Sequence, residues 1–319
     1  MPGRLHPFLV QLPLAYLREH GGVPEELGGA GGWRMESPDG VPVGVQRALL
    51  EVVAARGGER ALLGLGERVA GVVDQPLLFV MLNARSVIDL LDKEQRFNRF
   101  FHSHHRVRIH EHTQDQVVLE HYGFDAAPAR VESLFVLGLH LVLFGQIGCS
   151  GLSVRFPASD HPDDTLAGPD YGAPPAGNVA CWRIAWQRFQ ARREPMVGLD
   201  ELLLGQARPR DLSEDESTVA RLRRLVEQDL AHRWTVAEVA AGLHTSGRSL
   251  QRELSAADTT FSRELERARV EAAKRLLADP KRSVTEIGYV CGFSDGAHFS
   301  RRFKALAGLS PAAFRAQRA

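Results

Sequence analysis

The chain has 319 residues, enough for two domains that each bury a core, and its 44% apolar and 24% charged residues are typical of a soluble globular protein. Its formal net charge is zero, but residues 213–319 carry 18 Lys and Arg against 14 Asp and Glu, which leaves 21 against 25 for the rest. A basic C-terminal part fits contact with a polyanion. The three cysteines are odd in number and form no CxxC pair, which argues against a disulfide framework or a zinc site.

The N-terminal stretch MPGRLHPFLVQLPLAYL contains His and Pro and lacks a small-residue cleavage site, so it does not have the features of a signal peptide. The most apolar stretch, residues 134–148, falls short of a membrane span and carries His140. We therefore expect a cytoplasmic protein with no membrane partner.

The first 190 residues mix helical and alternating patterns. After a Gly- and Pro-rich start of about 45 residues, apolar side chains recur at three- and four-residue spacing, and later they alternate around the polar turn TQDQ. These patterns predict an α+β N-terminal domain. Its expected helices cover residues 46–73, 75–101 and 132–147, its hairpin 106–119, and its further strands 153–156 and 181–186.

A change of composition marks the boundary between two domains. Residues 191–216 are rich in charged residues, Gly and Pro, and no proline follows between Pro209 and Pro280. We predict an N-terminal domain over residues 1–190, a linker over 191–216 and an all-α C-terminal domain over 217–319.

The C-terminal domain begins with a pattern typical of a helix-turn-helix. Thr235 is placed to cap one short helix, and Ser246 is placed to cap the next, which buries Leu250 and Leu254. A longer helix of about 18 residues follows and ends before Pro280. At 1.5 Å per residue it would span about 27 Å, which is near one turn of DNA at about 34 Å.

The same pattern then repeats. Ser283 and Asp295 are placed as N-caps, Gly292 suits a left-handed turn, and Ser310-Pro311 opens a last helix. The equivalent core positions Leu250 and Phe299 lie 49 residues apart. We infer two helix-turn-helix units joined by a linker helix, the product of an internal duplication.

The second unit, SVTEIGYVCGFSDGAHFSRRFKALAGLSPAAFR, resembles the signature of the AraC/XylS family of transcription regulators. Gly288 is the main departure, since the family prefers Ala there. The matching positions are Ile287, Gly292, Phe293, Asp295, Phe299, Arg301, Phe303, Lys304, Gly308, Ser310, Pro311, Phe314 and Arg315.

This resemblance implies a sequence-specific regulator that binds double-stranded promoter DNA. The second helix of each unit would be the recognition helix. Its side chains that do not face the core would face the major groove of DNA, where Arg pairs with guanine and Gln with adenine. The base contacts implied are Arg248, Gln251, Arg252, His298 and Arg301, and the phosphate contacts are Ser249, Arg302, Lys304 and Arg315.

The N-terminal domain, around ALLGLGERV, resembles the arabinose-binding-like effector and dimerisation domain of some AraC-type regulators. This implies an unknown small-molecule effector, a homodimer, and an activator that works with RNA polymerase, without a cofactor. No GxSxG, HExxH or cysteine-nucleophile setting is present, so we do not expect an enzyme.

Two alternatives remain open for this domain. The segment from His102 to His121 is rich in histidine, and on a regular strand His110 and His112 would point to one face, as in a metal-responsive regulator. An exposed polar strand explains the same residues, so no metal site is assigned. The other alternative is a ligand-independent regulator whose first half only dimerises.

Overall fold

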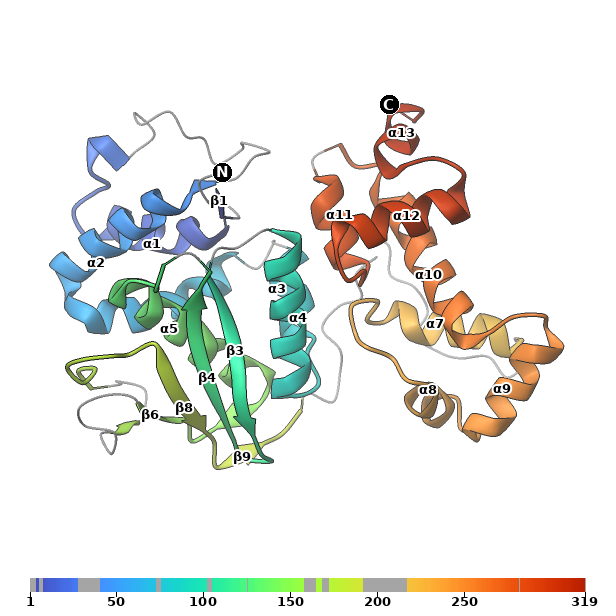
Figure 1. Ribbon diagram of the computed structural model, residues 1–319, viewed down its shortest axis with the longest axis horizontal. Coiled ribbons are helices and arrows are strands. Elements are labelled where there is room, and N and C mark those ends of the chain that lie inside the picture. Colours follow the sequence, from blue (N-terminus) through green and yellow to red (C-terminus); the bar gives the residue numbers. More distant parts are fainter. Residues whose placement is uncertain are drawn as a thin grey trace. The chain divides into compact units, whose positions relative to one another are not determined.

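The computed structural model describes residues 4–5, 8–27, 41–72, 76–101, 105–124, 126–157, 165–167, 172–191, 217–280 and 282–318. Contacts divide the chain into two compact units, which are described separately (Figure 1). Unit 1 comprises residues 1–73, 85–87 and 101–192, and unit 2 comprises 74–84, 88–100 and 193–319. The predicted linker lies outside the described residues except for Ala191, and so do His102 and His104.

Unit 1 combines helices with an antiparallel sheet, as expected for its α+β class. A kink at Gly58, where φ is 71°, interrupts the helix predicted over residues 46–73, and its last part is a 3-10 helix. Its helices are α1 (Phe8–Glu19), η1 (Glu25–Leu27), α2 (Val43–Gly64), η2 (Leu65–Val72) and α5 (Arg130–Ile147), and two short ladders pair β1 (Arg4–Leu5) with β2 (Val41–Pro42) and β5 (Cys149–Ser150) with β9 (Arg188–Phe189).

The sheet has five strands in the order β3-β4-β8-β6-β7. The predicted hairpin is confirmed, because β3 and β4 pair directly across the turn at residues 113–116. Trp182 and Ile184 of the central strand are fully buried. The strands are β3 (His105–His112), β4 (Gln116–Gly123), β6 (Ser153–Arg155), β7 (Thr165–Ala167) and β8 (Cys181–Ala185).

Helix α5 is the most apolar element of unit 1. It packs on α2 and η2, and its polar residues Glu132, Ser133 and His140 are buried. Among the described residues it is the helix that is long and apolar enough to cross a membrane by length and composition, and 61% of it is buried. That burial is typical of the core helix of a soluble domain.

Unit 2 is entirely helical in its described part, and it includes two helices from the first third of the chain. The helix predicted over residues 75–101 is two helices, separated at residues 83–86. The helices of unit 2 are α3 (Pro76–Leu82), α4 (Val87–Phe100), α7 (Thr218–Glu227), α8 (Val236–Gly242), α9 (Gly247–Ala256), α10 (Phe261–Leu276), α11 (Val284–Val290), α12 (Gly296–Ala307) and α13 (Pro311–Ala316).

Side-chain caps fix where the C-terminal helices begin, and all five predicted caps are confirmed. Thr235 and Ser283 form capping boxes with Glu238 and Glu286. The three further side chains accept hydrogen bonds from backbone amides three residues later, and they are Ser246, Asp295 and Ser310. Each cap satisfies an amide that the helix itself leaves unpaired.

The internal repeat is visible in the backbone. His244 after α8 and Gly292 after α11 both have left-handed φ values, 56° and 82°, and they lie 48 residues apart. Each turn leads into a longer capped helix, so α8–α9 forms a first helix pair and α11–α12 a second. Between the pairs runs α10, whose 16 residues are two fewer than predicted and end at Leu276, before Pro280.

The two left-handed glycines of unit 2 differ in their surroundings, which permits a matched test. A Cβ on Gly292 would overlap the carbonyl group of Leu230, whereas nothing lies within 4 Å of a Cβ on Gly308. We expect Gly308→Ala to lower the free energy of unfolding by about 1 kcal/mol, the cost of a left-handed alanine. Gly292→Ala should cost about 3 kcal/mol or more, measured by denaturant unfolding of the full chain. Equal effects of the two substitutions would contradict the crowding described at Gly292.

Candidate nucleic-acid interface

Helix α9 exposes the polar face that the sequence predicts. Leu250 and Leu254 are buried beneath it, while Arg248, Gln251 and Arg252 are exposed. Arg248 and Arg252, four residues apart, share the face opposite to the core, and Gln251 lies at its flank. Ser249 is half-buried, and its amide donates to the cap oxygen of Ser246.

Helix α12 has the same organisation around two aromatic side chains. Phe299 and Phe303 are buried, and Arg301, Arg302 and Lys304 are exposed. Arg302 also forms an ion pair of 2.9 Å with Glu266 of α10, so part of its charge is already balanced. The short side chains of the first turn, Gly296 and Ala297, are exposed as well.

His298 and Arg315 are less accessible than the other predicted contacts. His298 is half-buried, its Nδ1 lies 3.0 Å from the hydroxyl of Ser294, and burial lowers the pKa of its imidazole. A neutral imidazole is suited to a hydrogen bond with a base edge rather than to a charge contact with phosphate. Arg315 is half-buried, and its Nε donates to the carbonyl oxygen of Leu277 at 3.4 Å.

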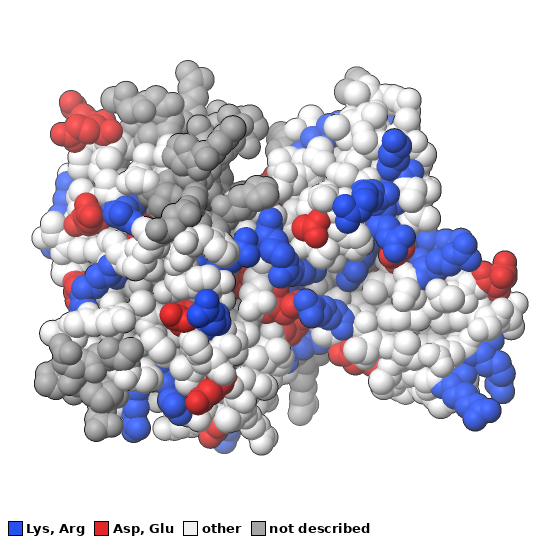
Figure 2. All heavy atoms as spheres, viewed as in Figure 1, with Lys and Arg blue, Asp and Glu red and all other residues white. Residues whose placement is uncertain are grey.

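Basic side chains gather over both helix pairs. On the face shown in Figure 2, Lys and Arg side chains lie over α12 and at the end of unit 2 that holds α9. Within unit 2 the exposed positively charged candidates thus belong to the two structurally equivalent helices. An arrangement of this kind neutralises DNA phosphates and presents donors to base edges.

A buried carboxylate, which was not predicted from the sequence, fixes α10 against α7. Glu264 is fully buried, and it accepts hydrogen bonds from Thr259 (2.6 Å), Arg223 (2.6 Å) and Arg267 (2.8 Å). Burial acts to raise the pKa of Glu264, but these hydrogen bonds and the two guanidinium charges outweigh it, so its pKa is lowered. The carboxylate stays charged and holds three donors in place.

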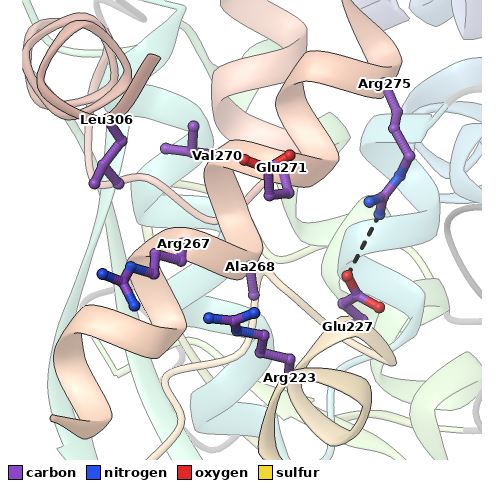
Figure 3. A pocket seen from close by; sticks show the side chains of 8 residues that line it. All are labelled: Arg223, Glu227, Arg267, Ala268, Val270, Glu271, Arg275 and Leu306. Atoms are coloured by element: carbon purple, nitrogen blue, oxygen red, sulfur yellow. Dashed lines mark ion pairs between the residues drawn. The ribbon is translucent and has the colours of Figure 1, made fainter. Parts of the chain in front are cut away.

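Unit 2 also has an open cavity of about 540 Å³ beside α10 (Figure 3). Its arginines are partnered by carboxylates, since Arg275 lies 3.6 Å from Glu227 and the two others pair with Glu264. The cavity therefore carries little unbalanced charge for an anionic ligand. Its lining residues are Arg223, Glu227, Arg267, Ala268, Val270, Glu271, Arg275 and Leu306.

The prediction that His110 and His112 share one face of a regular strand is wrong. A β-bulge shifts the register between Ile109 and Glu111. The alternation of side chains between the two faces of the sheet is therefore not continuous across the bulge. His110 bonds to Glu120 at 2.8 Å, whereas His112 is exposed and lies opposite Val117 in the ladder. The bulge therefore interrupts the regular alternation on which a shared face of His110 and His112 depended.

The helix pairs and their caps are those of helix-turn-helix structure, and the exposed basic faces suit contact with DNA. Residues 239–317 match a helix-turn-helix domain family, and similar curated proteins are transcription regulators. The transcriptional activator NphR of a Rhodococcus species is 36% identical over 102 residues, which cover 32% of this chain and 30% of NphR. The transcriptional activator RhaS of Escherichia fergusonii is 32% identical over 153 residues, which cover 41% of this chain and 55% of RhaS.

The C-terminal part of the chain is therefore an AraC-type DNA-binding domain, and its relatives are regulators of transcription rather than enzymes. A crystal structure of a transcriptional regulator with an AraC-type DNA-binding domain from Chromobacterium violaceum aligns with 32% of this chain and 92% of that chain, at 29% identity and a TM-score of 0.31. The chain spans about a third of the length of the first curated relatives it matches.

The cap of α12 gives a prediction for pH dependence. The hydrogen bond from the His298 amide holds the pKa of Asp295 below its ordinary value, which is about 3.9 in an unfolded chain. The stability contributed by the charged cap is present above that unfolded value and is lost as the pH falls through the lower folded value. Asp295→Asn keeps the capping oxygen but does not titrate. We expect thermal unfolding of the Asn variant to be less sensitive to pH between about 3 and 5. Parallel pH profiles for the two proteins would contradict this role of Asp295.

Proposed function

We propose that this chain is a sequence-specific transcription regulator in which α8–α9 and α11–α12 are two helix-turn-helix units, joined by α10, with α9 and α12 as recognition helices. The observation that carries the proposal is the repeated geometry. Two capped helices in equivalent positions each bury one apolar face and expose arginine on the other, notably Arg252 and Arg301.

The length of α10 supports simultaneous binding of both units. Its 16 residues extend over about 24 Å at 1.5 Å per residue. Together with the widths of the helix pairs at its ends, this is compatible with two neighbouring major-groove segments about 34 Å apart. The buried Glu264 fixes the orientation of this spacer, because it ties the start of α10 to α7.

We assign direct base contacts to Arg248, Gln251, Arg252, His298 and Arg301, and phosphate contacts to Ser249, Arg302, Lys304 and Arg315. Guanidinium and amide groups match the donor and acceptor edges of guanine and adenine in the major groove. Gly296 and Ala297 leave the first turn of α12 without long side chains, so the second unit reads fewer bases than the first and depends more on phosphate contacts.

The proposed regulator acts in the cytoplasm on promoter DNA, as an activator that contacts RNA polymerase. We retain residues 217–319 as the DNA-binding domain and 191–216 as the linker, with a homodimer as the active form. Effector binding and dimerisation are assigned to the part of residues 1–190 that belongs to unit 1, which leaves out α3 and α4. A buried polar cluster in unit 1 supports an effector site there. His121 lies 3.1 Å from Ser133, and the indole N–H of Trp182 has no hydrogen-bond partner among the described residues.

Selection of DNA by the purified full chain tests the proposal directly. Random-sequence duplexes would be enriched by repeated binding and recovery, and the winners compared with a shuffled duplex of the same composition. A specific duplex should be bound at least about a thousandfold more tightly than the shuffled one at physiological salt. If no sequence is enriched, or if both duplexes are bound equally, the proposal of sequence-specific binding is wrong.

Two neighbouring arginines on α12 should have different effects. We expect Arg301→Ala to cost about 1–3 kcal/mol in binding and to relax the selected sequence at one base position. Arg302→Ala should weaken binding to all sequences alike and lower the slope of affinity against salt by about one. Fluorescence anisotropy over a salt series, with a repeated selection for each variant, distinguishes the two roles. An unchanged base preference for Arg301→Ala would refute its assignment to a base.

A further inference from the structure

Helices α3 and α4 belong to the DNA-binding unit, although they lie about 120 residues before its next element along the chain. The contacts of α4 within unit 2 are specific and of three kinds: a buried charge cluster, an aromatic contact with α11, and a hydrogen bond to the turn before α12. Each kind connects α4 to a different part of the predicted DNA-reading surface.

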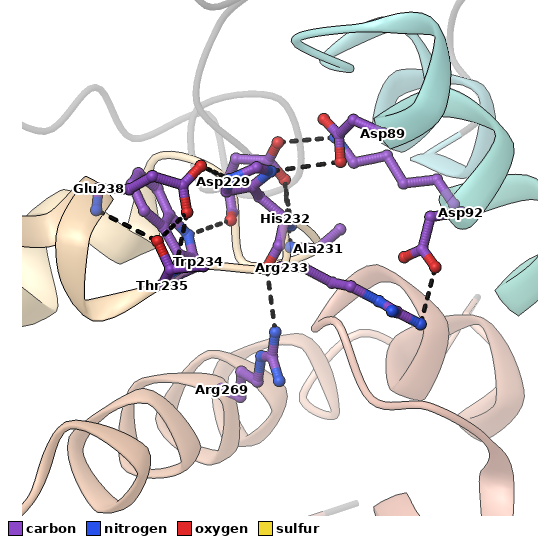
Figure 4. Close-up of polar contacts among 11 residues, drawn as sticks. Asp89, Asp92, Asp229, Ala231, His232, Arg233, Trp234, Thr235, Glu238 and Arg269 are labelled. Atoms are coloured by element: carbon purple, nitrogen blue, oxygen red, sulfur yellow. Dashed lines mark hydrogen bonds and ion pairs between the residues drawn. The ribbon is translucent and has the colours of Figure 1, made fainter. Parts of the chain in front are cut away.

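The charge cluster centres on Lys93, whose side chain is fully buried. Figure 4 shows the cluster's carboxylates, Asp89 and Asp229, together with His232. Its ammonium lies 2.7 Å from Asp229 and 3.4 Å from Asp89. Asp229 in turn accepts hydrogen bonds from the amides of Ala231 and His232, in the loop between α7 and α8. A buried ammonium without partners is very costly, so Lys93 is satisfied only when α4 lies against this loop.

The ligand atoms of the cluster are spaced closely enough to bind a metal ion, but the ammonium group of Lys93 already lies among them. Asp89, Asp229 and His232 each offer a ligand atom within 4.8 Å of the others. The Lys93 ammonium lies against both carboxylates, where a metal ion would otherwise be held. We therefore assign the cluster to docking of α4, and Lys93 takes the place of the ion.

His232 extends the cluster to the start of α8. Its Nδ1 lies 3.2 Å from Asp89 of α4, and its Nε2 lies 2.9 Å from Glu238, the capping-box residue of α8. One ring thus connects α4 to the helix that supports α9. The more exposed pair between Arg233 and Asp92, at 2.7 Å, adds little energy because water screens it.

The aromatic contact connects α4 to α11. The rings of Phe97 and Phe100 meet Tyr289 edge to face, with centroids 5.8 and 6.0 Å away, and the tyrosine hydroxyl donates to the carbonyl oxygen of Lys93 at 3.1 Å. Tyr289 is fully buried. The last four residues of α11 are all buried and point around the helix, so they need a cover beyond α12, and α4 supplies it.

The departure from the family pattern at Gly288 has its reason in the same contact. A Cβ there would lie 2.7 Å from the ring of Phe299 and 2.9 Å from the ring of Phe100. The alanine that the family prefers would press on the α4 ring as well as on the helix-pair core. Glycine at this position makes room for Phe100.

The hydrogen bond connects α4 to the entry of α12. The Nε atom of Arg99 donates to the carbonyl oxygen of Ser294 at 3.3 Å, directly before the Asp295 cap. From these contacts we propose that α3 and α4 are a positioning element for DNA binding: docked on α11 and on the turn before α12, they hold the second helix-turn-helix in its DNA-binding orientation. The inference rests on the DNA binding proposed above.

Linkage gives this element a regulatory consequence. Along the chain, the segment is flanked by residues of unit 1 at both ends, 1–73 before it and 101–192 after it. Because DNA binds better when α4 is docked, a ligand that shifts the docking changes the affinity for DNA, and DNA changes the affinity for that ligand by the same factor. DNA must also shift the docking of α4 toward the docked state. This reciprocity separates a positioning role from a merely structural one.

The test uses Phe100→Ala in the full chain, with the duplex selected by the wild-type protein as the probe. We expect affinity to fall about tenfold, with footprint protection lost over the half-site bound by α12 and kept over the other half. Phe124→Ala is the matched control, since Phe124 is 59% exposed in unit 1. That variant should bind as the wild type does.

Two further measurements keep the outcome decisive even if Phe100→Ala folds poorly. Gly288→Ala should weaken binding in the wild-type background and less in the Phe100→Ala background, where the methyl group meets the ring of Phe299 but no longer that of Phe100. In the wild-type protein, saturating duplex should slow amide hydrogen exchange over residues 88–100.

Two outcomes would overturn the positioning role while leaving DNA binding intact. One is amide exchange over residues 88–100 that DNA does not change. The other is a folded Phe100→Ala chain with the affinity and footprint of the wild type. If the wild-type chain enriches no duplex, the proposed DNA binding falls and this inference falls with it.

Discussion

The DNA-binding unit depends on covering and capping helices that are too short to be stable alone. Helices α8 and α11 have seven residues each, about two turns, and an isolated helix of that length does not persist in water. Each begins with a capping box and ends in a left-handed residue, so both of its ends are satisfied by local hydrogen bonds and turn geometry. The apolar side chains of α8 and α11 must still be buried, and this requirement decides which other helices pack against them.

The two short helices meet that requirement differently. Helix α8 buries Val239 and Ala240 and leaves most of its other side chains partly exposed. Helix α11 buries four consecutive residues, 287–290, which cannot all face a single partner because they point around the whole helix. The second helix pair therefore needs a cover that the first does not, and in this chain α4 provides it with Phe97 and Phe100. The two helix pairs thus differ in their surroundings.

The features predictable from the sequence were those that local chemistry decides. The five N-caps, the left-handed position at Gly292, the hairpin turn and the inward positions of both helix pairs follow from residue type and spacing over a few residues. Three features could not be predicted from the sequence. Two depend on partners far away in the chain, and the third depends on one extra residue inserted into a strand. Lys93 is buried only because Asp229, 136 residues away, receives it. In the sequence Glu264 looks like any exposed carboxylate on a helix. Its burial depends on Arg223, which lies 41 residues earlier in the chain. The bulge in β3 has no marker in the sequence and interrupts the alternation between His110 and His112.

Gly288 shows how a departure from a family pattern carries structural information. Taken alone, the exchange of alanine for glycine on a helix is a small loss of helix propensity, about 1 kcal/mol. In the structure the missing methyl group is the space into which Phe100 fits, so the loss in one helix permits the docking of another. A domain boundary drawn from the matched residues 239–317 alone would omit the partner that explains this glycine. The partner of the buried Tyr289 hydroxyl and the ammonium beside Asp229 would be omitted with it. Gly288 departs from the family pattern, and α4 lies outside the matched residues 239–317. Within unit 2 the two therefore belong to one packing arrangement.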